Sequence, residues 1–103
     1  MNYKEIEKQI ATLQRLLTEG RNVNSDALYK HIGGKIRLAR ETKEWTQEDV
    51  AKILGKRRTS LTNIEAGKQA VQLHDLYQLC VILSIEIGDV LPAIEDVVKT
   101  END

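Results

Sequence analysis

The stretch Gln47–Lys68, QEDVAKILGKRRTSLTNIEAGK, decides the fold. Its spacing predicts two short helices, the second over residues 58–66, with Gly55 in the turn between them and Gly67 ending the second. The expected interior positions are small or apolar: Val50, Ala51, Leu54, Leu61 and Ile64. Because Ala51 is small, we expect the two helices to approach closely at a steep angle. The stretch therefore predicts a helix-turn-helix.

The outer face of the second helix is almost entirely polar, with Arg58, Thr59, Thr62 and Asn63 on it and Ser60 at its edge. Arg58 can donate two hydrogen bonds to guanine and Asn63 can pair twice with adenine, each pair giving about 1–3 kcal/mol of discrimination. Thr59 and Thr62 offer methyl groups to thymine or hydroxyls to phosphate. A short helix with this face is suited to the major groove of double-stranded DNA.

The charge distribution agrees with a DNA partner although the net charge is −1. Residues 52–68 contain five basic residues against Glu65 alone, a balance of +4, whereas residues 86–103 have a balance of −5. A local basic patch, not the total charge, is what binding a polyanion needs.

Apolar periodicity predicts further helices over residues 2–19, 27–42, 74–83 and 87–91, and Ile94, Val97 and Val98 allow another amphipathic turn. The inward positions expected in the 74–83 helix are Leu76, Leu79, Cys80 and Leu83. No alternation typical of strands is present.

Local signals refine these boundaries. Thr46 and Asp49 resemble a capping box, and either Ser25 or Asp26 is suited to cap the helix that follows. The paired glycines at 33 and 34 inside that helix indicate that another backbone passes close by, since each costs about 1 kcal/mol relative to Ala.

The N-terminal segment carries an apolar stripe with the 3–4 spacing of a heptad: Tyr3, Ile6, Ile10, Leu13 and Leu17, with Leu16 widening it. Two heptads are fewer than the three or four that identify a coiled coil. The stripe can pack on its own domain, on a second copy of the chain or on another protein, and the sequence leaves these alternatives open.

Other function classes find little support. No apolar run approaches the roughly 20 residues that span a bilayer, and the N-terminus lacks a signal-peptide core. The single cysteine, Cys80, falls on an apolar stripe, and His31 and His74 have no partner at metal-ligand spacing. We therefore expect a cytoplasmic protein with no catalytic site, no cofactor, no metal and no membrane association.

An ordered set of short motifs resembles one known family. The motifs are Ile32–Arg40 (IGGKIRLAR), Trp45–Ala51 (WTQEDVA), Gly55, Thr59–Lys68 (TSLTNIEAGK) and Gly88–Pro92 (GDVLP). Together, over about 60 of the 103 residues, they resemble the lambda-repressor-like, xenobiotic-response-element (XRE) family of helix-turn-helix proteins. The 58–65 and 72–77 segments also look like XRE regulators of mobile elements and prophages.

The resemblance implies roles for individual residues. Gln47 matches a glutamine that contacts a phosphate and braces the recognition helix, and Lys68 matches a phosphate clamp. Arg40 and Glu65 match an ion pair that joins two helices. The base-reading positions match Arg58, Thr59, Ser60 and Asn63; Arg57 and Thr62 are expected to reach phosphates.

Three positions depart from the family pattern. Glu44 stands where a glycine is usual before Trp45, so a left-handed turn is less comfortable there. Arg57 replaces the usual Ser or Thr cap and can reach a phosphate instead, and Ala70–Val71 replace a frequent proline.

The expected fold is all-α: a lambda repressor-like five-helix domain over residues 25–92, an N-terminal amphipathic helix and linker over residues 1–24, and an acidic tail over residues 93–103. The expected function is transcriptional repression by a homodimer on a palindromic operator, since one recognition helix makes too few base contacts. The alternative is an antitoxin or adaptor that binds DNA for autoregulation and grips a toxin or peptidase through the N-terminal helix or acidic tail.

Overall fold

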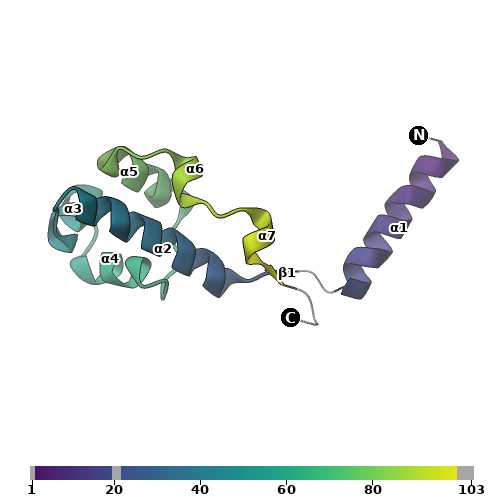
Figure 1. The fold of residues 1–103 in the computed structure, drawn as a ribbon, viewed down its shortest axis with the longest axis horizontal. Helices are drawn as coiled ribbons and strands as arrows, with labels where there is room; N and C mark the ends of the chain where they lie inside the picture. The colour runs from purple at the N-terminus through teal and green to yellow at the C-terminus, as the bar shows by residue number, and fades with distance from the viewer. Residues whose placement is uncertain (1, 20–21, 100–103) are drawn as a thin grey trace.

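A computed structural model describes residues 2–19 and 22–99, and it is built almost entirely from helices (Figure 1). The elements are α1 (Tyr3–Glu19), β1 (Asn22–Val23), α2 (Ser25–Thr42), α3 (Gln47–Leu54), α4 (Arg58–Glu65), α5 (Leu73–Leu83), α6 (Ile87–Val90), α7 (Ile94–Val97) and β2 (Val98–Lys99). The all-α prediction is confirmed, with α2–α6 as the five-helix domain and α1 as the additional helix.

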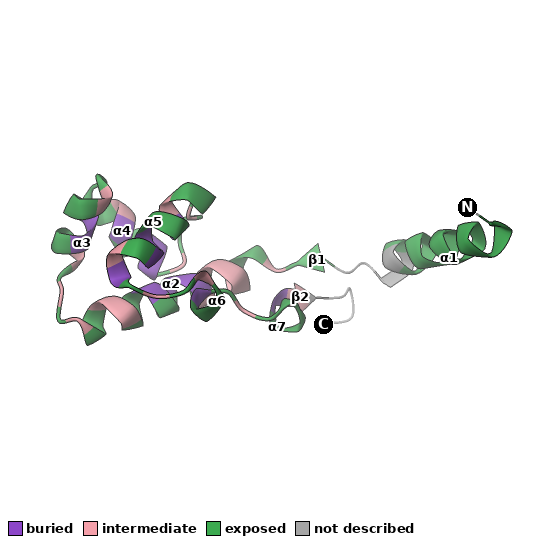
Figure 2. Ribbon diagram, turned by 90° about the horizontal axis from the view of Figure 1, so that it is seen from above, coloured by how far each residue is buried: buried purple, intermediate pink, exposed green. Residues whose placement is uncertain are grey.

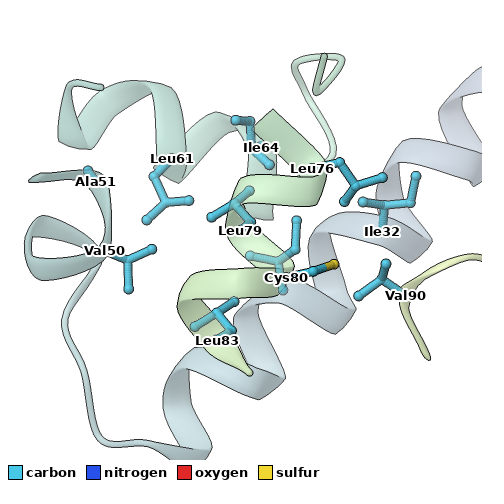
Figure 3. Packing of buried hydrophobic residues seen from close by; sticks show 11 residues of the cluster. Ile32, Val50, Ala51, Leu61, Ile64, Leu76, Leu79, Cys80, Leu83 and Val90 are labelled. Carbon is cyan, nitrogen blue, oxygen red and sulfur yellow. The ribbon is translucent and has the colours of Figure 1, made fainter. Parts of the chain in front are cut away.

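The core of the domain lies among α2–α6 (Figure 3). Helix α2 packs on α4, α5 and α6, while α3 packs on α4 and α5. The interior positions predicted in the 47–68 stretch and in the 74–83 helix are buried, except Leu54, which is only partly buried. The buried cluster consists of Ile32, Ile36, Val50, Ala51, Leu61, Ile64, Leu76, Leu79, Cys80, Leu83 and Val90. Burial of this cluster fixes how the two short helices α3 and α4 cross.

Specific caps set the ends of the helices around the turn. Thr46 accepts a hydrogen bond from the Asp49 amide and Asp49 accepts one from the Thr46 amide, so the predicted capping box is present. Gly55 ends α3 with a positive φ of 77°, as predicted. At α2 the prediction was wrong by one residue, because Asn24 is the cap and accepts from the Ala27 amide.

The glycine pair in α2 fulfils the close-approach prediction at one position only. A Cβ on Gly33 would overlap the backbone carbonyl oxygens of Ile64 and Glu65 in α4, whereas a Cβ on Gly34 would meet nothing within 4 Å. Gly33 therefore allows α2 and α4 to touch backbone to backbone, and Gly34 has no such role.

Two short strands join the ends of the domain, a feature that the sequence did not predict. Asn22 pairs with Lys99 and Val23 with Val98, in antiparallel orientation. The Asn24 amide donates to the Val97 carbonyl at 2.6 Å, and the Val97 side chain is buried. Part of the expected linker and part of the expected acidic tail thus pack together. The segment from Gly20 to Asn24 (GRNVN) has the composition of a turn; its first two residues lie outside the described residues.

Helix α1 lies apart from the domain, and its apolar stripe is exposed (Figures 1 and 2). Packing of the stripe on its own domain, one of the three alternatives, is not what the structure shows. Among the described helices none alone has the length and apolarity to cross a membrane; Leu73–Leu83 and Ile87–Val97 reach that threshold only as a pair bent by 107°.

Candidate nucleic-acid interface

The close crossing of α3 and α4 presents one face of α4 to solvent. Ala51 of α3 and Leu61 of α4 are almost fully buried where the helices meet. Ile64 extends the buried side of α4 by one turn. Because these positions fix the inner side of α4, the residues between them must point outward.

The exposed face of α4 carries the polar residues expected from the sequence. Arg58, Thr59, Thr62 and Asn63 are exposed and line one shallow hollow, while Ser60 is half-buried at the edge. The structure thus brings four of the expected contact residues together on one surface. Their functional groups include a guanidinium, a carboxamide and two hydroxyls, the types that pair with base edges and phosphates.

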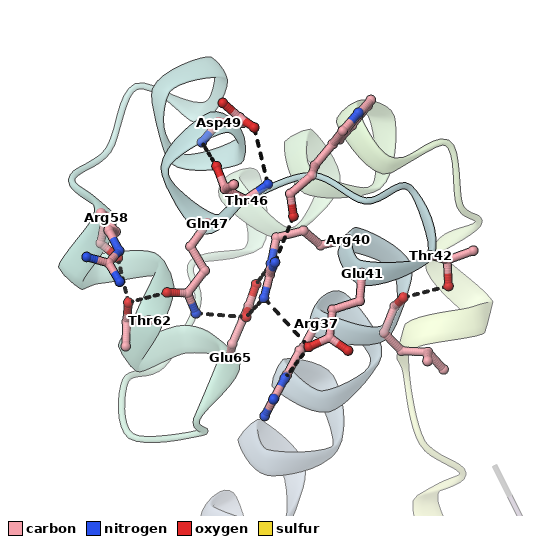
Figure 4. Close-up of polar contacts among 12 residues, drawn as sticks. Arg37, Arg40, Glu41, Thr42, Thr46, Gln47, Asp49, Arg58, Thr62 and Glu65 are labelled. Carbon is pink, nitrogen blue, oxygen red and sulfur yellow. Dashed lines mark hydrogen bonds and ion pairs between the residues drawn. The ribbon is translucent and has the colours of Figure 1, made fainter.

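A chain of hydrogen bonds braces α4 against α2 and α3 (Figure 4). Arg40 Nε donates to Glu65 Oε2 at 2.7 Å and its Nη2 donates to Glu65 Oε1 at 2.9 Å, a bidentate pair. Arg40 Nη1 also donates to the Trp45 carbonyl at 2.8 Å. The hydrogen bond to Glu65 raises the pKa of the Arg40 guanidinium above its usual value.

Gln47 continues the chain from α3 to the exposed face. Its Nε2 donates to Glu65 Oε1 at 3.0 Å, and its Oε1 accepts from the Thr62 hydroxyl at 2.8 Å. The bracing role that the resemblance implies for Gln47 corresponds to these contacts. Glu65, only 2% exposed in its side chain, therefore links three helices.

The Thr62 hydroxyl already has hydrogen-bond partners within the protein, which the sequence did not indicate. It lies 2.8 Å from Gln47 Oε1 and 3.0 Å from the Arg58 carbonyl, two acceptors that share its one hydrogen. To donate to a phosphate, Thr62 must give up these contacts. Its methyl group needs no such change.

Basic side chains surround α4. Arg57 occupies the N-cap position of α4 without making a side-chain cap hydrogen bond, and Lys68 follows the helix, its amide donating to the Asn63 carbonyl at 2.9 Å. Lys56 Nζ lies 3.5 Å from Asp75 Oδ2 on α5, a pairing that the sequence could not reveal. Because Asp75 partly neutralises Lys56, the patch is less positive than the charge of +4 counted over residues 52–68.

The turn before α3 takes the strained form that its sequence predicts. Glu44 has a left-handed φ of 59°. Trp45 is half-buried against the core, and Lys43 Nζ lies 5.2 Å from the centre of its ring. The indole thus covers the junction between α2 and α3.

Cys80 belongs to the core, and burial raises the pKa of its thiol, which keeps it protonated. Within residues 2–19 and 22–99 there is no cluster of three His, Cys, Asp or Glu residues that could hold a metal ion.

The comparisons with known proteins agree with this geometry. A model of the helix-turn-helix family matches residues 36–98. The restriction-modification controller protein C.AhdI from Aeromonas hydrophila superposes with a TM-score of 0.58 at 27% identity, covering 61% of this chain and 96% of C.AhdI. No curated protein matches significantly.

Two further solved structures share the fold at lower identity. The clp gene regulator ClgR from Corynebacterium glutamicum has a TM-score of 0.59 at 24% identity, over 60% of this chain and 66% of ClgR. Hydroxypropylphosphonic acid epoxidase from S. wedmorenis has a TM-score of 0.61 at 19% identity, but only 36% of that enzyme is covered. These likenesses concern the fold alone, and no catalytic activity follows from the second.

Proposed function

The chain belongs to the XRE-type helix-turn-helix family and is a DNA-binding transcription regulator, and from this premise we propose that it represses transcription as a homodimer on a palindromic operator. The observation that carries the proposal is the outer face of α4, where Arg58, Thr59, Thr62 and Asn63 share one exposed surface. Covering a promoter requires only tight and specific binding, and that is the chemistry this face offers.

In this proposal α4 enters the major groove and reads base edges. Arg58 donates two hydrogen bonds to guanine O6 and N7, and Asn63 pairs with adenine N6 and N7. Thr59 contacts a thymine methyl, and Ser60 reaches a base from the edge of the helix. The bracing of α4 through Glu65 supports this reading, since a rigid helix holds both bidentate pairs in register without further loss of entropy.

The phosphate contacts lie on either side of α4. The Gln47 amide group has two hydrogens, of which one binds Glu65, so the second is available to a phosphate oxygen. Arg57, not engaged in capping, and Lys68 supply positive charge at the two ends of the helix. Thr62 contributes a phosphate contact only where its hydroxyl turns away from Gln47.

The homodimer follows from the size of the reading surface. A single short helix contacts few base pairs, whereas two related by a two-fold axis read half-sites about 34–36 Å apart. C.AhdI is described as a controller protein of a restriction-modification system, and we propose a comparable controlling role for this chain at its own promoter target.

The proposal is tested by selecting bound duplexes from a random pool at about 0.15 M salt with the full chain. The expected result is a two-fold symmetric motif whose half-site contains a guanine and an adenine within one major-groove segment. A folded protein that enriches no motif would contradict the proposal and would indicate a protein as the main partner.

A further inference from the structure

Helix α1 exposes an apolar stripe that the described part of the chain leaves uncovered (Figure 2). The five side chains that form the stripe are between 41% and 82% exposed: Tyr3, Ile6, Ile10, Leu13 and Leu17. The opposite side of α1 is polar. A 17-residue helix in water is marginally stable without packing of its apolar face. We therefore expect another apolar surface to pack on the stripe.

We infer that this surface is α1 of a second copy of this chain, in a parallel two-stranded helix pair. In heptad terms Tyr3, Ile10 and Leu17 are a positions, while Ile6 and Leu13 are d positions. Parallel pairing places each residue opposite its own copy, so every layer of the pair is apolar. The central layers, Ile at a followed by Leu at d, are the combination that favours two strands.

The residues that flank the stripe favour an identical helix over a different partner. The e and g positions include Glu7, Gln9 and Gln14, and Gln9 of one copy would face Gln14 of the other. Glu7 of one copy would face Asn2 of the other, so no like charges are brought together. Charges at these positions set partner choice. Here Glu7 is the only charge among them, so identical copies meet no repulsion, and further charged side chains lie at outer positions: Lys4, Glu5, Lys8 and Arg15.

The position of α1 in the chain makes this pairing compatible with DNA binding. The chain enters the domain through β1, beside the start of α2, whereas α3 lies toward the other end of α2 and α4 crosses α2 near its middle, at Gly33 (Figure 1). Pairing through α1 therefore leaves the outer face of α4 open. A parallel pair also sets the two entry points side by side, so that two domains reach neighbouring half-sites; this last step rests on the proposed function.

The oligomeric state of the full chain without DNA tests the inference. We compare Leu13→Lys, which places a charge in a d layer, with Thr12→Lys, which adds the same residue to the outer side of α1, by light scattering after gel filtration at about 50 μM. Wild type and T12K are expected at twice the chain mass of 11.7 kDa and L13K at 11.7 kDa. Circular dichroism and thermal unfolding verify that the domain stays folded in all three.

Disulfide trapping tests the parallel orientation. With Ile6→Cys, mild oxidation is expected to cross-link the two copies, because identical d residues adjoin in a parallel pair. In an antiparallel pair Ile6 faces Leu13, which separates the two Ile6 positions by roughly 10 Å along the axis at 1.5 Å per residue, too far for a disulfide. Lys8→Cys, on the outer side, is the control and should not cross-link. The native Cys80 is buried and does not interfere.

Several results would overturn the inference. A monomeric wild type at about 50 μM, or a dimer that persists in L13K, would exclude α1 as the pairing surface. If a dimer that persists in L13K is lost in Val81→Lys, the pairing surface is the exposed side of α5, formed by Leu73, Tyr77 and Val81.

Binding to a single half-site distinguishes failure of the α1 pairing from failure of the proposed function. If α1 pairs, L13K binds one half-site with the affinity of wild type but binds the full palindrome at least about tenfold more weakly. If no variant binds DNA, wild type included, the proposed function alone is rejected.

Discussion

Glu65 joins α2, α3 and α4 through the hydrogen bonds of its side chain. Its carboxylate accepts two hydrogen bonds from Arg40 and one from Gln47, and it is almost completely buried. A negative charge this close to a DNA surface is tolerable because Arg40 neutralises it. The pair thus contributes the orientation of α4 rather than net charge.

Replacing Glu65 by Ala is expected to lower the free energy of unfolding by about 3–5 kcal/mol, since it leaves the guanidinium of Arg40, 11% exposed, without its partner. Urea denaturation measures the loss. The matched control is Glu41→Ala, which removes the exposed ion pair with Arg37 and a longer contact to Arg40 at 3.9 Å but leaves the bidentate Arg40–Glu65 pair, and it should leave stability nearly unchanged. Equal losses for both variants would show that the Arg40 pair is not structural.

Substitutions of Asn63 and Lys68 separate the proposed base contacts from the proposed phosphate contacts. Asn63→Ala is expected to relax base preference at one operator position, because the bidentate pair with adenine is lost. Lys68→Ala is expected to weaken binding to all sequences similarly and to lower the slope of log K against log salt by about one unit. Binding of a panel of single-base operator variants at several salt concentrations measures both, and the same uniform loss in the two variants would refute the division of roles.

At the scale of elements, the contact between α2 and α4 depends on Gly33. Gly33→Ala is expected to destabilise the domain by about 1–3 kcal/mol, because the new methyl group overlaps backbone that cannot move without displacing α4. Gly34→Ala, one residue away in open space, is expected to stabilise it by about 0.5–1 kcal/mol through helix propensity. Thermal unfolding of the pair checks the prediction; destabilisation by both would contradict the packing described.

The turn between α2 and α3 contains removable strain. Glu44→Gly is expected to raise the free energy of unfolding by about 0.5–1 kcal/mol, because glycine adopts the left-handed conformation without steric cost while losing some chain entropy. Glu48→Gly, within the first turn of α3, is the control and should lower it instead. A Glu44→Gly variant less stable than wild type would show that the side chain contributes more than its backbone strain costs.

Elements with a strong period or a specific cap were predictable from the sequence, and elements that depend on distant partners were not. The apolar spacing of α2–α5, the Thr46–Asp49 box and the Gly55 turn are local signals, and the structure has them. Strands β1 and β2 are two residues each, too short for any alternation, and arise from the meeting of segments about 75 residues apart.

The same distinction holds for the candidate site. The polar outer face of α4 follows from helical spacing, so its residues could be named in advance. The pairing of Lys56 with Asp75 and the engagement of Thr62 with Gln47 depend on how separate helices cross, which spacing does not encode. Gly33 and Gly34 look alike in sequence, and only the path of α4 distinguishes them.

For the whole molecule, the proposed DNA-reading surface and the proposed pairing surface lie on different helices. The face that carries Arg58 and Asn63 lies on a braced helix of the folded domain, while the uncovered apolar stripe lies on α1, joined to that domain near β1. Because these surfaces are separate, substitutions are expected to remove DNA binding and pairing independently.

The central claim is that the outer face of α4 contacts DNA, and amide chemical shifts of the full chain during titration with its selected duplex test it most directly. The largest changes are expected at Arg58–Asn63, with further changes at Gln47 and Lys68 and little change along α1 or at Leu73, Tyr77 and Val81. Large changes confined to α1 or α5, with α4 unaffected, would contradict it.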